Sequence, residues 1–185
     1  MSDPTILALD LAARTGWALG KVYDRTPRSG SLRFASAGAS MGAIFSSYRS
    51  WLGRMVNEAA IDLVVFESPM TPSHMGGRTN ITTIRMLMGL PAVTEEFFFT
   101  KGLAHDLFYD VREAKVSDIR RHFLGGKLHR RVAAKALTIA ACRRLGWAPA
   151  DDNAADALAL WHYQASVFEP RLALQTSPLF RRERP

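Results

Sequence analysis

The strongest constraint on the fold of this chain is a continuous apolar run, IDLVVFE, at residues 61–67. A strand with one face in water alternates apolar and polar residues, whereas a strand buried on both faces is apolar throughout. The run therefore predicts a central strand that lies parallel to a neighbour in a sheet flanked by helices. It ends on a carboxylate, Glu67.

The other elements follow from periodicity and turn signals. Short apolar or alternating segments predict further strands at 6–10, 15–20, 30–35 and 106–111, and the first three form a meander. Helical spacing predicts helices at 41–59, 81–101, 115–124, 130–145 and 152–168. Pro91 is expected to break or kink the second helix. This order predicts one α/β domain over residues 1–168, followed by a basic, loosely ordered tail at 169–185.

Composition limits the class of protein. The chain has 185 residues, of which 48% are hydrophobic, so one domain with a substantial core is expected. The single cysteine, Cys142, excludes an internal disulfide framework and a cysteine-rich zinc site. No apolar run reaches the roughly 18 to 20 residues of a membrane-spanning helix. The N-terminal segment also lacks the pattern of a secretion signal, so we expect a cytoplasmic protein without membrane contact.

Acidic side chains from two strand ends are expected to meet at one edge of the sheet. Asp10 ends the first strand and Glu67 ends the fourth, and the carboxyl ends of parallel neighbours share an edge. Open α/β sheets usually hold their sites at this edge. An aspartate at the end of a strand is also a common turn former, so Asp10 alone does not decide the question.

A third acidic group lies in the helical segment DDNAADALALWHY at residues 151–163. Asp156 stands four residues after Asp152 and three after Asn153, so the three side chains share a helix face. Asp151 is expected to be the helix N-cap. Carboxylates that pack together repel one another unless a cation lies among them. Hard oxygen ligands suit Mg²⁺ or Mn²⁺ and not zinc.

Positive charge is concentrated in residues 112–144, which carry ten Lys or Arg and two acids, a net charge of +8. Such a block is usually a solvated helix face. The alternative interpretation is a surface that binds a polyanion, and the charge count does not separate the two.

Three motifs, LALDLAARTGWA, LVVFESP and NAADALALW, together resemble the RuvC-like Holliday-junction resolvases of the ribonuclease H-like superfamily. The resemblance extends from about residue 5 to residue 165, and AADALA (154–159) is its most specific part. The first motif also resembles the start of sugar kinases, but 185 residues leave no room for their second half. The short length and divergent loops favour a phage or prophage member.

The resemblance implies a central five-stranded mixed sheet, built from a three-stranded meander and two parallel strands and flanked by helices. It implies that Asp10, Glu67 and Asp156 are catalytic metal ligands. The family usually has Asp or His where this chain has Asn153, so either Asp152 or Asn153 supplies the fourth ligand. Two Mg²⁺ ions per site, replaceable by Mn²⁺, would then hydrolyse a phosphodiester.

The resemblance also assigns DNA contacts and a homodimer. The helical segment 81–101 is the expected interface, because the three consecutive aromatics of EEFFF (95–99) cannot all face one core. Packing between two neighbouring helices is the alternative. Met70 and His74 lie in the loop after Glu67, where relatives often place an aromatic that enters the junction. The remaining candidate phosphate contacts are basic residues in the first loop and in the positive block: Arg14, Lys115, Lys127, Arg130 and Arg131.

The sequence thus predicts a metal-dependent, structure-selective DNA endonuclease that resolves four-way junctions. A nuclease of the same fold that cleaves flaps, forks or RNA–DNA hybrids is an alternative. A catalytically inactive junction-binding relative is another, and Asn153 favours it because an amide brings no charge to the site.

Overall fold

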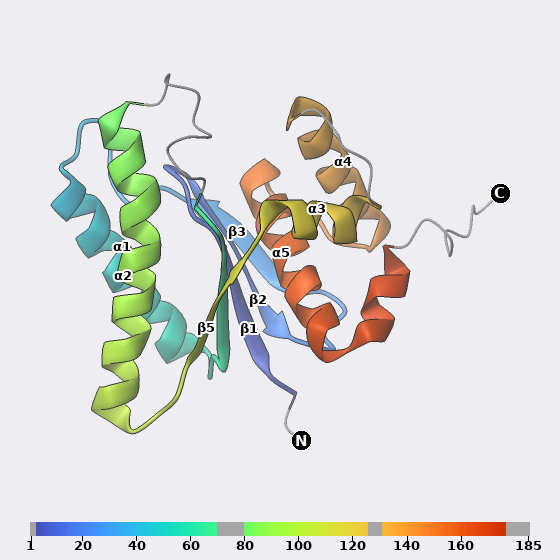
Figure 1. Ribbon diagram of the computed structural model, residues 1–185, viewed down its shortest axis with the longest axis horizontal. Helices are drawn as coiled ribbons and strands as arrows, with labels where there is room; N and C mark the ends of the chain where they lie inside the picture. Colours follow the sequence, from blue (N-terminus) through green and yellow to red (C-terminus); the bar gives the residue numbers. More distant parts are fainter. Residues whose placement is uncertain (1–2, 70–79, 126–130, 177–185) are drawn as a thin grey trace.

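The sheet has five strands in the order β3-β2-β1-β4-β5 (Figure 1). The computed structural model describes residues 3–69, 80–125 and 131–176, with the backbone alone at 131 and 132. Strands β1 and β2 pair antiparallel, as do β2 and β3, whereas β1, β4 and β5 run parallel. This confirms the predicted mixed sheet. The strands are β1 Thr5–Asp10, β2 Thr15–Lys21, β3 Arg28–Leu32, β4 Leu63–Glu67 and β5 Asp110–Ala114.

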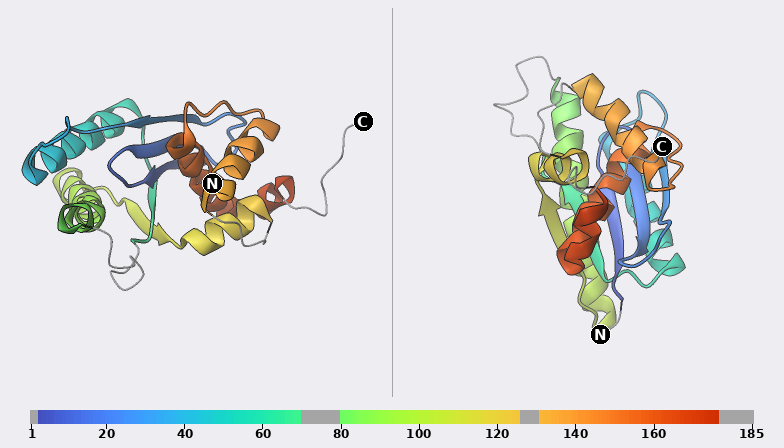
Figure 2. Two further views of the ribbon diagram at one scale, coloured as in Figure 1. Left: turned by 90° about the horizontal axis from the view of Figure 1, so that it is seen from above. Right: turned by 90° about the vertical axis from the view of Figure 1, so that its right-hand side faces the viewer.

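Helices cover both faces of the sheet (Figures 1 and 2). Helices α1 (Met41–Glu58) and α2 (Ile81–His105) lie on one face. On the other face lie α3 (Val116–Leu124), α4 (Arg131–Arg144) and α5 (Asp152–Phe168), followed by the 3₁₀ helix η2 (Pro170–Gln175). In the described part of the chain, no helix combines the length and apolarity needed to cross a bilayer.

The central strands supply both hydrophobic cores, as the apolar run predicts. In β4, Val64 and Phe66 pack with α1 and α2, while Leu63 and Val65 pack with α3, α4 and α5. Val64, Val65 and Phe66 have no exposed surface. Because burial on both faces fixes the pairing of β1 with β4, the polar residues at their ends are held in register.

Two predicted boundaries within residues 81–114 are wrong: the helix was expected to end at 101 and the strand to begin at 106. Helix α2 continues through Pro91 to His105, because the buried Leu90, Phe97 and Phe98 hold it against the core despite the lost backbone hydrogen bond. The fifth strand therefore begins at Asp110 and not at 106. Residues 106–109 instead reverse the chain, starting with Asp106 in the left-handed conformation at φ 51°.

A histidine pair joins the last helices of the domain. His122 Nε2 lies 2.8 Å from His162 Nδ1, linking α3 to α5, and the Thr176 hydroxyl donates to the His122 carbonyl at 2.9 Å. Burial lowers the pKa of both histidines to about 4, and for His122 the neighbouring His162 adds to the effect. Residues 170–176 are thereby attached to the domain, while residues 177–185 of the predicted tail lie outside the described residues.

We expect this pair to destabilise the fold in acid. Below pH 6.5 unfolded histidines bind protons, whereas the folded pair stays neutral down to about pH 4. Stability is therefore lost as the pH falls through this window, by at most about 1.4 kcal/mol per pH unit for each histidine. Urea unfolding from pH 7.5 to 5 should show a smaller loss for His162→Gln than for the parent protein.

The exposed His105 gives the matched control, and His105→Gln should keep the parent pH dependence. Comparing variants cancels the contributions of carboxylates, which titrate in the same range. Equal losses in the parent and in His162→Gln would contradict the assignment.

Candidate active site

Two of the predicted acidic residues emerge side by side at one edge of the sheet. Leu9 of β1 pairs with Phe66 of β4 in a parallel ladder, and Asp10 and Glu67 are the next residues of the two strands. Both side chains keep some solvent contact, but protein surrounds most of each carboxylate. The end of β5 lies at the same edge, because Ala114 pairs with Glu67.

The first turn of α5 reaches this edge because Gly16 has no side chain. Gly16 pairs with Asp10 in the β1–β2 ladder. A Cβ atom on Gly16 would lie 2.0 Å from the backbone oxygen of Asn153, well inside van der Waals contact. The glycine therefore allows the start of α5 to pack directly on β2 beside Asp10. This role of Gly16 was not predicted, although a glycine that closely follows a strand-terminal aspartate was the available signal in the sequence.

The electrostatics show that the acidic residues from three segments act on one another. Burial raises the pKa of Asp10 well above its usual value, and the charges of Glu67, Asp156 and Asp152 raise it further. Burial and the charge of Asp156 raise the pKa of Glu67 to about 7. Desolvated, mutually repelling carboxylates of this kind favour a bound cation.

Two basic side chains partly offset this negative charge. The charge of Arg120 favours the ionised form of Glu67, and the charge of Lys135 favours that of Asp10. In the sequence both residues are recognisable only as members of the basic block at 112–144. Their separation from the acidic motifs along the chain left no local signal for either contact.

The two candidates for the fourth ligand have different surroundings. The Lys135 ammonium donates to Asp152 Oδ2, and the Asn153 amide nitrogen lies 3.4 Å from Asp152 Oδ1. The hydrogen bond from Lys135 is the main reason that the pKa of Asp152 is lowered. Asp152 is therefore an ionised carboxylate with a partner at each oxygen.

The N-cap of α5 is held from β3 and from the first loop. As predicted, Asp151 caps the helix, accepting from the Ala154 amide at 2.9 Å. Ser31 donates to the same carboxylate, and Arg14 lies 3.7 Å from it and donates to Ser31 at 3.0 Å. Partial burial raises the pKa of Asp151, but these hydrogen bonds and the Arg14 charge outweigh it, and the net pKa is lowered.

The predicted DNA contacts are only partly described. Lys115 is exposed at the N-cap of α3, directly after β5, and so lies at the edge that carries Asp10 and Glu67. Arg14 is about half exposed beside α5. Met70, His74, Lys127 and Arg130 lie outside the described residues, as does the side chain of Arg131.

The chemistry of the donors fits a hard divalent cation, since the site offers carboxylates and an amide oxygen. Among residues 3–69, 80–125 and 133–176, no three Asp, Glu, His or Cys side chains are already arranged to hold a metal ion. Cys142 is no candidate nucleophile, because burial and the nearby Asp156 charge raise the pKa of its thiol to about 12.

Solved structures provide the comparison, since no family model and no curated protein matches the sequence. The structure of Thermus thermophilus RuvC in complex with a Holliday junction substrate matches with a TM-score of 0.64 and 12% identity. The match covers 91% of this chain and 96% of the RuvC chain. The chain has the RuvC fold.

Two further matches agree on this ribonuclease H-like fold. A second Thermus thermophilus RuvC structure matches with a TM-score of 0.58 and 14% identity, over 91% of this chain and 96% of the other. The yeast mitochondrial Holliday junction resolvase Ydc2 matches with a TM-score of 0.57 and 8% identity. This match covers 94% of this chain and 82% of the Ydc2 chain. The resemblance read from the three motifs is thus confirmed as a shared fold. The RuvC fold accounts for nearly the whole chain.

Substitution of Gly16 tests how the site is assembled. Gly16→Ala should force α5 away from β2, because the new methyl group meets backbone atoms that cannot rotate aside. Overpacking of this kind costs about 1–3 kcal/mol. Thermal or urea unfolding measures the loss.

Gly53→Ala is the matched control, because its Cβ meets no atom within 4 Å inside α1, and a gain in stability of up to about 1 kcal/mol is expected there. An unchanged stability of Gly16→Ala would show that α5 does not rely on this contact.

Proposed function

We propose that the chain is a divalent-metal-dependent DNA endonuclease that cleaves four-way junctions. The observation that carries the proposal is the convergence of Asp10, Glu67 and Asp156 at one sheet edge of a RuvC fold. A RuvC structure with this fold is a complex with a Holliday junction substrate. The proposed location is cytoplasmic.

In the proposed mechanism Asp10, Glu67 and Asp156 would hold two Mg²⁺ ions during cleavage, or Mn²⁺ in their place, with Asp152 or Asn153 as the fourth ligand. The ions would supply Lewis acidity for activating a water molecule and for stabilising the leaving oxygen of the phosphodiester. The chain itself positions the carboxylates on two strand ends and a helix. Strand pairing fixes Asp10 relative to Glu67, and the contact at Gly16 fixes α5 relative to both.

Basic side chains around the acidic edge would bind the phosphates of the DNA backbone. Lys115 and Arg120 are exposed at the start of α3 and within it, directly after β5. Arg14 lies beside Asp151 at the start of α5. Positive charge on both sides offsets the repulsion between a phosphate and the carboxylates. The +8 block that contains Lys115 and Arg120 would attract the polyanion to this edge.

The carboxylates can be tested by cleavage of labelled four-way, flap, duplex and RNA–DNA hybrid substrates in Mg²⁺. Cleavage of the four-way junction is expected. Asp10→Asn and Glu67→Gln should each reduce it by about 100-fold or more without weakening junction binding, because each removes a charge that holds the cation. Glu113→Gln is the matched control, since Glu113 is exposed on β5.

Other outcomes select the alternatives. Binding without cleavage in the parent protein would identify an inactive relative. Preferential cleavage of a flap or a hybrid would keep the chemistry and replace the substrate.

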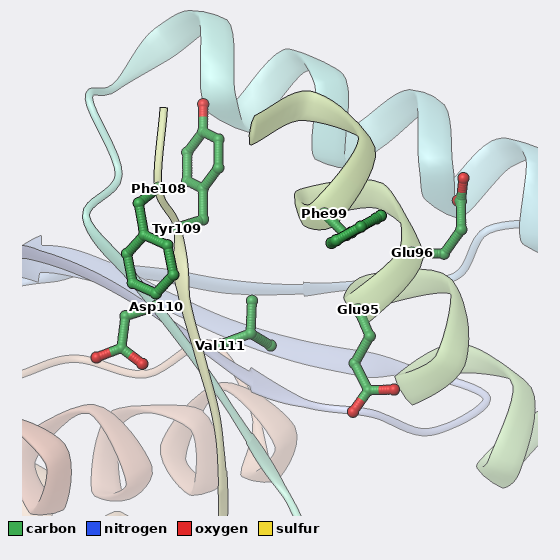
Figure 3. Close-up of a pocket in the computed structure, with 7 residues that line it drawn as sticks. All are labelled: Glu95, Glu96, Phe99, Phe108, Tyr109, Asp110 and Val111. Atoms are coloured by element: carbon green, nitrogen blue, oxygen red, sulfur yellow. The ribbon is translucent and has the colours of Figure 1, made fainter. Parts of the chain in front are cut away.

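A homodimer is proposed because resolving a junction requires two cuts. Of the three aromatics in EEFFF, Phe97 and Phe98 are buried in the core, whereas Phe99 is 68% exposed. Other large apolar side chains continue the exposed surface beyond α2: Leu103, Leu107 and Phe108. Figure 3 shows Phe99 from α2 and Phe108, just before β5, among the residues that line a pocket. The volume of this pocket is about 580 Å³. A second copy would cover this surface, which extends the sequence prediction of 81–101 to residue 108.

Charged substitutions on this surface should separate the subunits. The double variant Phe99→Asp and Leu103→Asp should sediment as a monomer at concentrations where the parent protein is a dimer. Val167→Asp is the control, since Val167 is also exposed but lies on α5, on the opposite side of the sheet. A double variant that remains dimeric would place the interface elsewhere.

A further inference from the structure

Lys135 contributes a fixed positive charge to the acidic site. It lies one turn into α4, where its ammonium bonds Asp152 and its charge also acts on Asp10. The side chains of Lys135 and Asp152 are only about one-third exposed, at 36% and 35%. The ion pair is therefore screened less by solvent than one on an open surface.

The site consequently departs from a four-carboxylate ligand set in two ways. Asn153 supplies an amide where the resembling family usually has Asp or His. Asp152 is a carboxylate, but Lys135 neutralises it and the Asn153 amide nitrogen lies near its second oxygen. In an amide only the oxygen has lone pairs to offer a cation, because the NH₂ group is a donor. The oxygen of Asn153 is therefore the atom that a cation would use.

We propose that Lys135 sets the number of divalent ions that the DNA-free site holds to one, by keeping Asp152 out of the ligand set. The inference rests on the proposed metal-dependent function. Asp10, Glu67 and Asp156 would present three negative charges to a bound cation, and the opposite charges of Asp152 and Lys135 act on Asp10 in opposite directions. One divalent ion leaves this set at −1, whereas a second would bring it to +1 beside a lysine ammonium.

A purely structural role is the competing explanation, because Lys135 also joins α4 to α5. Such a clamp would change the stability of the fold but not the number of bound ions. The number of ions is therefore the decisive measurement, and it does not depend on cleavage.

The experiment is a Mn²⁺ titration of the DNA-free full chain, with bound ions counted by calorimetry and by electron paramagnetic resonance. The parent protein should bind one ion per chain. Lys135→Met removes the charge at similar length and should bind two, because Asp152 becomes available. Lys135→Arg keeps the charge and should bind one. Combining Lys135→Met with Asp152→Asn should return the count to one, since the released carboxylate is then lost.

Two ions in the parent protein would overturn the inference, as would one ion in a folded Lys135→Met protein. Circular dichroism checks folding, and Lys135→Gln replaces the methionine variant if that variant does not fold. Failure of the proposed function looks different. It would appear as no Mn²⁺ bound by the parent protein, or as a count that Asp10→Asn and Glu67→Gln leave unchanged.

Discussion

Mutual repulsion between carboxylates at the ends of β1 and β4 is the constraint on which the rest of the site depends. Burial and the charges of neighbouring carboxylates raise the pKa of Glu67 to about 7 and that of Asp10 well above its usual value, so ionising both is costly without nearby positive charge. The chain supplies some of that charge through Arg120 and Lys135. The negative charge that these two residues leave uncompensated is the physical reason for proposing a divalent cation at this edge.

The scaffold tolerates this repulsion because its stability comes from elsewhere. The central strands are packed on both faces, with Ile6, Ala8 and Val65 facing one helical layer and Leu7, Leu9 and Phe66 facing the other. These apolar contacts fix the strand register whatever the charge state of the strand ends. A stable double-sided core can thus hold a destabilising polar edge, an arrangement common at functional sites.

Sequence patterns predicted most elements because strands and helices impose local periods. They failed at 106–111, where DLFYDV alternates like a strand but follows a helix that core packing extends to His105. Pro91 does not break α2, because the tertiary contacts of its neighbours outweigh the local cost of a proline. The aromatics in EEFFF also needed the structure, because only packing decided that Phe97 and Phe98 point inward and Phe99 outward.

The sequence by itself determined the chemistry of the site: which strands and helix carry Asp10, Glu67 and Asp156, and that their oxygens suit a hard cation. These features follow from residue identity and from where each element ends. Only the tertiary structure decided which distant groups modify that chemistry. Gly16 admits the backbone of Asn153, Lys135 binds Asp152, and Arg120 acts on Glu67. Such contacts depend on how α3, α4 and α5 pack against the sheet, and no local period in the sequence records that packing.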